Sequence, residues 1–435
     1  MSNELENKKR AVLIAEAGVN ALKDTFRGSD INAILAATTA VPQYINYPEP
    51  NAGTDAATYF NRNPLAHLEA MNVDFENLPT QIGTRTVNGF LTPAGGVPFG
   101  TGGRYWAKTT DNDDGDGDLT VDTDKTVYLR VVGIQRNSGG QVSIYGGNVQ
   151  NSIAIIEATL KRDRAFAFNG AFTFYGADLL PMAGANILEG AAYDIDGYDH
   201  PAMTLADLVA GNHSHVAGGD SAGINAINEP NASTLVNTLL NEPPLPNTVI
   251  GNTASPSIED VTSDITSNPD VDADNILDAT YVMNFIENLE MQSLVDITLA
   301  DGANYSGDLG SDADPKITVA EGDVRLGGGG SGAGLLIVKG RLDFVSNYDY
   351  RGLVLVVGDG EFDLGGGPVG ILGGVFLANT IDNGDDTYSY GLPSFTIRGP
   401  GNFYFQSSAI DLALDLTPMK TIVWREITRA VEPPY

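Results

Sequence analysis

The C-terminal third of this sequence contains a repeat of short aliphatic runs. Short aliphatic runs begin at residues 317, 335, 353 and 375, so the first three starts are evenly spaced and the fourth comes slightly later. Shorter strand patterns and glycine-rich turns separate them. Units of this size cannot bury a core alone and stack on their neighbours. We therefore predict a short parallel β-helix-like stack, to which residues 395–398 and 402–406 could add a turn. An antiparallel meander with similar turn spacing is the alternative.

The other end of the chain has the pattern of an amphipathic helix, over residues 4–27. Small residues beside its apolar stripe would permit close packing, and Gly28 is a natural stop. Ser29 is placed to cap a second short helix that ends near Ala37. The apolar stripe, which follows the helical period, consists of Val12, Ala15, Val19, Leu22 and Phe26.

The middle of the chain has weaker patterns. Residues 38–100 are irregular, and strands are predicted over 104–109, 127–134, 141–145 and 152–161, the second of them half-buried because apolar and polar residues alternate. Residues 162–300 mix short strands with helices over 204–210, 233–240 and 275–293. The predicted fold class is mainly β with an N-terminal α-helix. Its domains are a helical segment (1–40), an irregular α+β region with acidic loops (41–300) and a glycine-rich β-helix-like domain (301–435).

The charge balance excludes some classes of partner. The net charge is -32, from 24 basic and 56 acidic residues. Such a surface repels nucleic acid and anionic lipid and attracts divalent cations. The absence of cysteine excludes disulfides and zinc–thiolate sites. No apolar run is long enough to span a bilayer and no signal peptide precedes the first helix, so we expect no membrane contact and a mature or truncated chain whose export segment is missing.

The densest local signal is an acidic turn in which every second residue from Asp111 to Asp124, on average, is a carboxylate. Asn112, Asp114 and Asp116 fit positions 1, 3 and 5 of a Ca²⁺ loop, and Gly117 fits position 6. Thr123 occupies position 12 in place of glutamate, so this is no true EF-hand. Oxygen ligands favour structural Ca²⁺ over transition metals, and a solvated hairpin tip is the alternative. The candidate ligands are Asp111, Asn112, Asp114, Asp116, Asp118, Asp122 and Asp124.

A second acidic segment has the same alternate-residue spacing and leads into the predicted helix 275–293. It is a second candidate Ca²⁺ site, although negative charge at a helix N-terminus is also favourable without a metal. Its candidate ligands are Asp270, Asp272, Asp274 and Asp278.

The motifs that could indicate catalysis have the wrong context. The sequence from Gly219 to Gly223 fits G-x-S-x-G, but no hydrophobic strand precedes it. His213 and His215 have no third ligand nearby, so an exposed loop is the better interpretation. An aromatic set, which could stack on sugars but fits core packing better, comprises Phe344, Tyr348, Tyr350 and Phe362. We predict no enzyme activity and no catalytic residues.

Several segments together resemble PilX-type accessory proteins of type IV pili. The N-terminal helix contains the motif Ala-Glu-Ala-Gly (15–18), and the acidic turn 111–129 resembles the turn that precedes a strand in that family. Further similar segments are 155–161, 190–197, 316–378 and 424–426. The resemblance implies a pilin-like helix that packs in a filament, with the globular part displayed outside. The hydrophobic first half of the pilin helix and the prepilin cleavage site are absent here.

The expected function is therefore a non-enzymatic, extracellular cell-surface or pilus-associated subunit with an assembly or adhesion role and Ca²⁺-stabilised loops. Its expected partners are other pilin-like subunits, through Val12, Ala15, Val19, Leu22 and Phe26, and a surface or glycan ligand. The alternative is a secreted carbohydrate-binding or polysaccharide-active β-helix protein. A third class is a free-standing adhesin or S-layer-like component, which would lack a pilin-type leader in its gene.

Overall fold

The chain folds into two compact units, and the second is inserted into the first. The computed structural model describes residues 2–42, 84–93, 96–112, 118, 120–135, 152–162, 166, 170–175, 186–188, 193–212, 221–227, 249–253, 256–263, 277–397 and 399–427. Unit 1 comprises residues 1–162 and 418–435, and unit 2 comprises residues 163–417. The sequence-based boundaries at residues 40 and 300 do not coincide with these units. The division instead follows β27 (Met419–Ile427), which returns to the sheet of unit 1.

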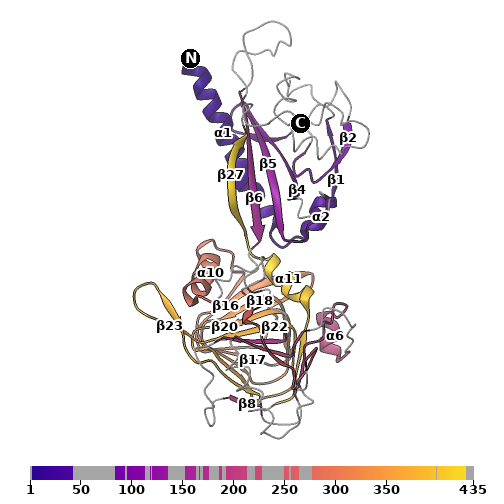
Figure 1. The fold of residues 1–435 in the computed structure, drawn as a ribbon, viewed down its shortest axis with the longest axis vertical. Coiled ribbons are helices and arrows are strands. Elements are labelled where there is room, and N and C mark those ends of the chain that lie inside the picture. Colours follow the sequence, from indigo (N-terminus) through magenta and orange to yellow (C-terminus); the bar gives the residue numbers. More distant parts are fainter. Residues whose placement is uncertain are drawn as a thin grey trace. The chain divides into compact units, whose positions relative to one another are not determined.

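Unit 1 is a long helix packed on one face of an antiparallel sheet (Figure 1). The strand order in this sheet is β27-β6-β5-β4-β3, and a separate antiparallel pair joins β1 to β2. The helices are α1 (Ser2–Lys23), the 3₁₀ helix η1 (Asp24–Phe26) and α2 (Ile31–Ala36). The strands are β1 (Thr38–Pro42), β2 (Thr84–Asn88), β3 (Val97–Phe99), β4 (Gly103–Asp111), β5 (Thr126–Gln135), β6 (Ser152–Arg162) and β27 (Met419–Ile427).

Two glycines bring α1 close to the sheet. A Cβ atom on Gly133 of β5 would lie 2.4 Å from the carbonyl oxygen of Ala11, and one on Gly18 would lie 2.7 Å from Val131. The helix backbone therefore rests almost directly on the strand. Its buried side chains include Ala15, Val19 and Leu22, which fill the core between helix and sheet together with Phe26 of η1. Each fully buried large side chain contributes about 1.5–3 kcal/mol.

Two local expectations for unit 1 were wrong. The cap of α2 is Asp30, whose carboxylate accepts the backbone N–H of Asn32 at 2.9 Å, whereas the hydroxyl of Ser29 donates to the carbonyl of Thr25. β5 is buried on both faces, with only Tyr128 exposed, although the sequence alternation predicts a half-buried strand. Its polar member Arg130 is buried because an ion pair compensates its charge.

Unit 2 is built on two mainly parallel sheets, whose strands alternate along the chain from residue 297 on. One sheet runs β11-β9-β26-β22-β20-β18-β16-β13 and the other β14-β17-β19-β21-β25-β8. Pairs along both sheets are parallel, which excludes the antiparallel meander. The strands from residue 297 on are β13 (Ile297–Leu299), β14 (Ala303–Tyr305), β15 (Gly310–Ser311), β16 (Asp314–Ala320), β17 (Val324–Leu326), β18 (Gly330–Val338), β19 (Arg341–Phe344), β20 (Tyr348–Val356), β21 (Glu361–Leu364), β22 (Val369–Ala378), β23 (Thr380–Asp382), β24 (Tyr388–Tyr390), β25 (Ser394–Ile397) and β26 (Gly401–Phe405).

The central region belongs to the same stack. Its strands extend the two sheets, because β7 pairs with β22, β9 with β26 and β8 with β25, all in parallel. The sequence predicts instead an irregular region separate from the repeats. These strands are β7 (Phe172–Tyr175), β8 (Asn186–Leu188), β9 (Tyr193–Asp196), β10 (Ile224–Ala226), β11 (Val249–Ile250) and β12 (Ile258–Asp260).

The repeat spacing is confirmed for the first two steps and shifted in the third. Leu335 lies beside Ile317 and Leu353 beside Leu335, as the run starts predict. Leu353 lies beside Gly374 rather than Val375, so the third step is shorter than predicted by a single position. The two extra strands near residues 395 and 402 are present as β25 and β26.

A column of glycines runs through the larger sheet. Gly334, Gly352 and Gly373 lie side by side in β18, β20 and β22, each with positive φ. A Cβ atom on Gly352 would lie 2.0 Å from the carbonyl oxygen of Gly334, and one on Gly373 would lie 1.9 Å from that of Gly352. Glycine is required here because each strand bends at this point against the backbone of its neighbour.

Helices and aromatic rings complete unit 2. α11 (Ser407–Asp415) packs beside the larger sheet, with Ile410 against Gly374 (Figure 1). α10 (Ala279–Met291) contributes Phe285 and Ile286 to the same core, and α6 (Leu205–Ala210) packs on Leu372 and Tyr404. Between the sheets, Phe362 contacts the rings of Phe344, Phe172 and Phe403.

Candidate functional site

The acidic turn between β4 and β5 is the strongest candidate site. Among the predicted ligands, Asp111 ends β4, Asn112 follows it, and Asp122 and Asp124 precede β5. Asp111 and Asp122 are buried, whereas Asp118 is exposed and accepts the N–H and hydroxyl of Thr120. Asp114 and Asp116 lie outside the described residues.

Hydrogen bonds gather this turn around Asp122. One carboxylate oxygen of Asp122 accepts the Thr126 N–H at 2.9 Å, and Asp124 accepts the same N–H at 2.8 Å. Asn112 donates from its amide to the other oxygen of Asp124 at 3.0 Å. The backbone of Asp122 is held by Asn32, which accepts its N–H at 2.6 Å and donates to its carbonyl at 3.1 Å. The turn is therefore tied directly to α2.

The electrostatics of the turn disfavour an isolated buried charge. The pKa of Asp122 is raised to about 7, chiefly because burial disfavours the ionised carboxylate. Lys125 and the Thr126 N–H lower the pKa, and the charges of Asp124 and Asp111 raise it. By contrast, the pKa of exposed Asp118 is lowered by its hydrogen bonds to Thr120.

The donor set of the turn suits a hard cation. Asn112 Oδ1 and Asp122 Oδ2 are buried and accept no hydrogen bond from any residue that the structure describes. Carboxylate and amide oxygens are the ligands that Ca²⁺ prefers. Over the same described ranges, no three His, Cys, Asp or Glu side chains are already gathered as a metal-binding group. A cation here would thus draw on the amide and on water as well as on the carboxylates.

The second acidic segment has a different explanation where it is described. Asp278 is the N-cap of α10, and its carboxylate accepts the N–H of Thr280 at 2.8 Å. This role needs no metal. Asp270, Asp272 and Asp274 lie outside the described residues.

The described residues of two of the candidate motifs for catalysis or sugar binding have packing roles. Ser221 of the G-x-S-x-G match is buried, and its carbonyl oxygen accepts the N–H of Asn252. A Cβ atom on Gly197 or Gly251 would lie 2.3 Å from that same oxygen, so these glycines allow three chain segments to cross closely. The aromatic set of Phe344, Tyr348, Tyr350 and Phe362 is at most 1% exposed, which confirms the core interpretation. His213 and His215 lie outside the described residues.

Unit 1 also contains a charge cluster that the sequence does not reveal, in which Glu157 and Arg130 are buried and Arg425 is exposed. In adjacent strands, Arg130 of β5 and Arg425 of β27 lie on either side of Glu157 of β6. Arg130 pairs with one oxygen of Glu157, and Arg425 donates two hydrogen bonds to the other, at 2.8 and 2.5 Å. Side chains alternate along a strand, so this cluster lies on the face opposite Val131 and α1. One carboxylate thus compensates two guanidinium groups.

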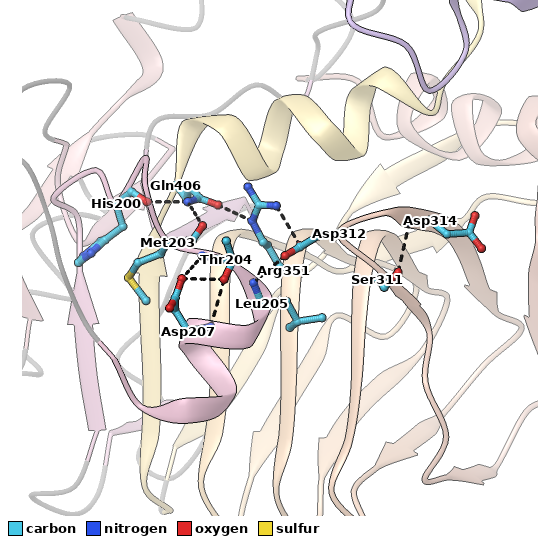
Figure 2. A network of polar contacts seen from close by, with 10 residues as sticks. All are labelled: His200, Met203, Thr204, Leu205, Asp207, Ser311, Asp312, Asp314, Arg351 and Gln406. Carbon is cyan, nitrogen blue, oxygen red and sulfur yellow. Dashed lines mark hydrogen bonds and ion pairs between the residues drawn. The ribbon is translucent and has the colours of Figure 1, made fainter.

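A second polar network, also missed from the sequence, joins α6 and α11 in unit 2 (Figure 2). Buried Gln406 donates to the carbonyls of His200 at 2.5 Å and Met203 at 2.8 Å, and it accepts from Arg351 at 2.7 Å. Arg351 pairs with Asp312, which also accepts the first N–H of α6, that of Leu205. The polar groups of this network satisfy one another's hydrogen bonds, which is typical of a network that stabilises a fold.

Replacing Gln406 by alanine is expected to destabilise unit 2 by about 2 kcal/mol or more, since buried carbonyl and guanidinium groups lose their partner. Chemical denaturation followed by far-ultraviolet circular dichroism measures this change. Ser311→Ala is the matched control from the same region, because its hydroxyl is exposed and accepts the N–H of Asp314. We expect the control to change stability by less than about 0.5 kcal/mol. Equal effects of the two substitutions would contradict a stabilising role for Gln406.

Comparison with known proteins adds no family. No protein-family model matches the chain, and neither does any curated protein or solved structure. Within the part of the chain that the structure describes, none of the helices has the length and hydropathy needed to cross a bilayer.

Proposed function

We propose that this chain is a non-enzymatic subunit of an extracellular filament or cell surface, of the kind suggested by its resemblance to type IV pilus accessory proteins. The proposal rests on α1, whose N-terminal part extends beyond the sheet on which its C-terminal part packs. One face of its C-terminal part packs on the sheet of unit 1, while residues 5–10 are exposed except for Asn7. A helix that extends beyond its own sheet is suited to pack among helices of other subunits.

The surface available for such packing differs from the predicted one. Ala15, Val19, Leu22 and Phe26 are buried against the chain's own sheet, so they are not free for a neighbouring subunit, and Val12 is half-buried. Where the side chains of α1 are described, its large exposed apolar residues are Leu5 and Leu13, at 59% and 57% exposure. We therefore assign the subunit contact to the surface of α1 that carries Leu5 and Leu13 and does not pack on the sheet.

For unit 2, we infer that the alternating strands of the two parallel sheets are successive turns of a short β-helix. Parallel neighbours at a nearly constant spacing along the chain support this winding. Such a stack offers broad faces to a surface or glycan ligand, in an adhesion or assembly role. The acidic composition disfavours a nucleic acid or an anionic lipid surface as the partner.

Leu13→Glu is expected to reduce the amount of the chain in sheared surface filaments of its source cells by about tenfold or more. The reason is that an exposed leucine buried at an interface contributes about 1.5–3 kcal/mol, which the charge removes. Immunodetection in the surface and cell fractions measures the change. Val209→Glu is the matched control, because Val209 is 58% exposed on the short helix of unit 2. Recovery of the wild-type chain from the cell interior alone would reject the proposal.

A further inference from the structure

We propose that the described residues at the two ends of the connection between β4 and β5 bind one Ca²⁺ ion, which fixes Asp122 to the start of α2. The proposed ligands come from the described residues at the two ends of the acidic turn. They are oxygen atoms of Asp111, Asn112, Asp122 and Asp124.

The first support is the state of two buried oxygens. Asp122 is 3% exposed, and its Oδ2 atom accepts no hydrogen bond from the described residues; the same holds for the buried Oδ1 atom of Asn112. A buried acceptor without a donor costs free energy, and a buried carboxylate costs more than an amide. A cation between these oxygens supplies the missing interaction.

The second support is the arrangement of the charges. Asp111 and Asp124 both interact electrostatically with Asp122 and disfavour its ionised form, so a cation at Asp122 would offset their negative charges, although the three carboxylates are not gathered closely enough to form a metal-binding group by themselves. The amide nitrogen of Asn112 donates to Asp124. The amide oxygen of Asn112 takes no part in that bond and is left to bind a cation. Six to eight oxygen ligands in flexible geometry are typical of Ca²⁺, whereas Mg²⁺ requires a near-ideal octahedron. Carboxylates, one amide and water meet the Ca²⁺ requirement.

The third support links the site to α2. Asn32 holds both backbone groups of Asp122, and its own N–H is held by Asp30, the N-cap of α2. A cation that fixes Asp122 must therefore also fix the first turn of α2. Because this inference concerns cation binding by the isolated chain, its failure would leave the filament role untouched.

The test is a Ca²⁺ titration of the full chain by calorimetry, with thermal unfolding followed by tryptophan fluorescence. The two tryptophans, Trp106 and Trp424, both belong to unit 1, so their emission reports on the unit that contains the site. Asp122→Asn is expected to remove one binding event or to weaken it by at least about tenfold. Asp118→Asn is the matched control, because Asp118 lies in the same turn but is exposed and bonded to Thr120.

The order of the melting temperatures of the wild type and Asp122→Asn should reverse between excess chelator and Ca²⁺. In excess chelator, Asp122→Asn is expected to melt at or above the wild-type temperature, because the buried charge is gone. With Ca²⁺ present, the wild type is expected to melt higher than the variant, and Mg²⁺ should produce a smaller shift. The proposal is overturned if Ca²⁺ leaves the melting temperature of the wild type unchanged. It is also overturned if Ca²⁺ raises the melting temperature of Asp122→Asn by the same amount. Should that variant fail to fold, Asn112→Ala provides the same comparison.

The link to α2 has its own measurement. Hydrogen exchange of residues 31–36 should slow when Ca²⁺ is added to the wild type. In Asn32→Ala, we expect Ca²⁺ to bind while these residues keep the same exchange rate with and without it. An undiminished Ca²⁺ response of α2 in that variant would refute the coupling.

Discussion

Alanine in place of Gly352 is expected to destabilise unit 2 by about 4 kcal/mol or more, at the upper end of single substitutions. Two costs combine at this position. Its φ of 142° lies in a region that residues with a side chain rarely adopt. In addition, the new methyl group would lie 2.0 Å from the carbonyl oxygen of Gly334. Backbone on both sides is held in parallel strands, so neither partner can move away cheaply.

Two measurements isolate this effect. Far-ultraviolet circular dichroism should show an earlier unfolding transition, while tryptophan emission, which reports on unit 1, should keep its own transition. Gly365→Ala is the control, because its Cβ atom would meet Asp363 at a comfortable 3.6 Å, and its φ is not positive. If Gly352→Ala and Gly365→Ala unfold alike, the glycine column is not a packing requirement.

Glutamine in place of Glu157 is expected to destabilise unit 1 by about 3–5 kcal/mol, because it removes the carboxylate that pairs with the buried guanidinium of Arg130. The side chains of Glu157 and Arg130 are 8% and 9% exposed, so water cannot replace the lost partner. The substitution also removes the ion pair between residue 157 and Arg425, which would loosen β27 from β6.

The control for this substitution is a surface ion pair in the same unit. Glu6 pairs with Arg10 at 2.7 Å, but both side chains are more than half exposed. Glu6→Gln should therefore change stability by less than about 0.5 kcal/mol. Denaturation followed by tryptophan emission measures both variants, and a small effect of Glu157→Gln would show that the cluster is not needed for folding.

The elements with local signals were predicted from the sequence. The helix at the N-terminus, the helices at 205 and 279 and the repeat from residue 317 all follow from periodicity, caps and short β-branched runs. The place of the central strands was not predictable in this way. β7 joins the stack by pairing Phe172 with Val375, a contact between distant parts of the chain that no local pattern encodes.

The candidate site could likewise be predicted from the sequence only in part. A dense acidic segment identifies the β4–β5 turn, but only the fold brings Asn32 to Asp122 and leaves Asp118 in solvent. Gln406, His200 and Arg351 carry no motif, since their network is assembled from three separate parts of the chain. A polar residue in a glycine- and aromatic-rich repeat, such as Arg351, is the one signal that could have drawn attention to it.

Insertion of unit 2 has a consequence for biosynthesis. Arg162, where the chain leaves unit 1, lies opposite Met419, where it returns. The final strand of the first sheet thus emerges from the ribosome only after the whole stack has been translated. Until then the growing polypeptide has an open β6 edge, which a chaperone or an assembly partner could occupy before the chain closes it.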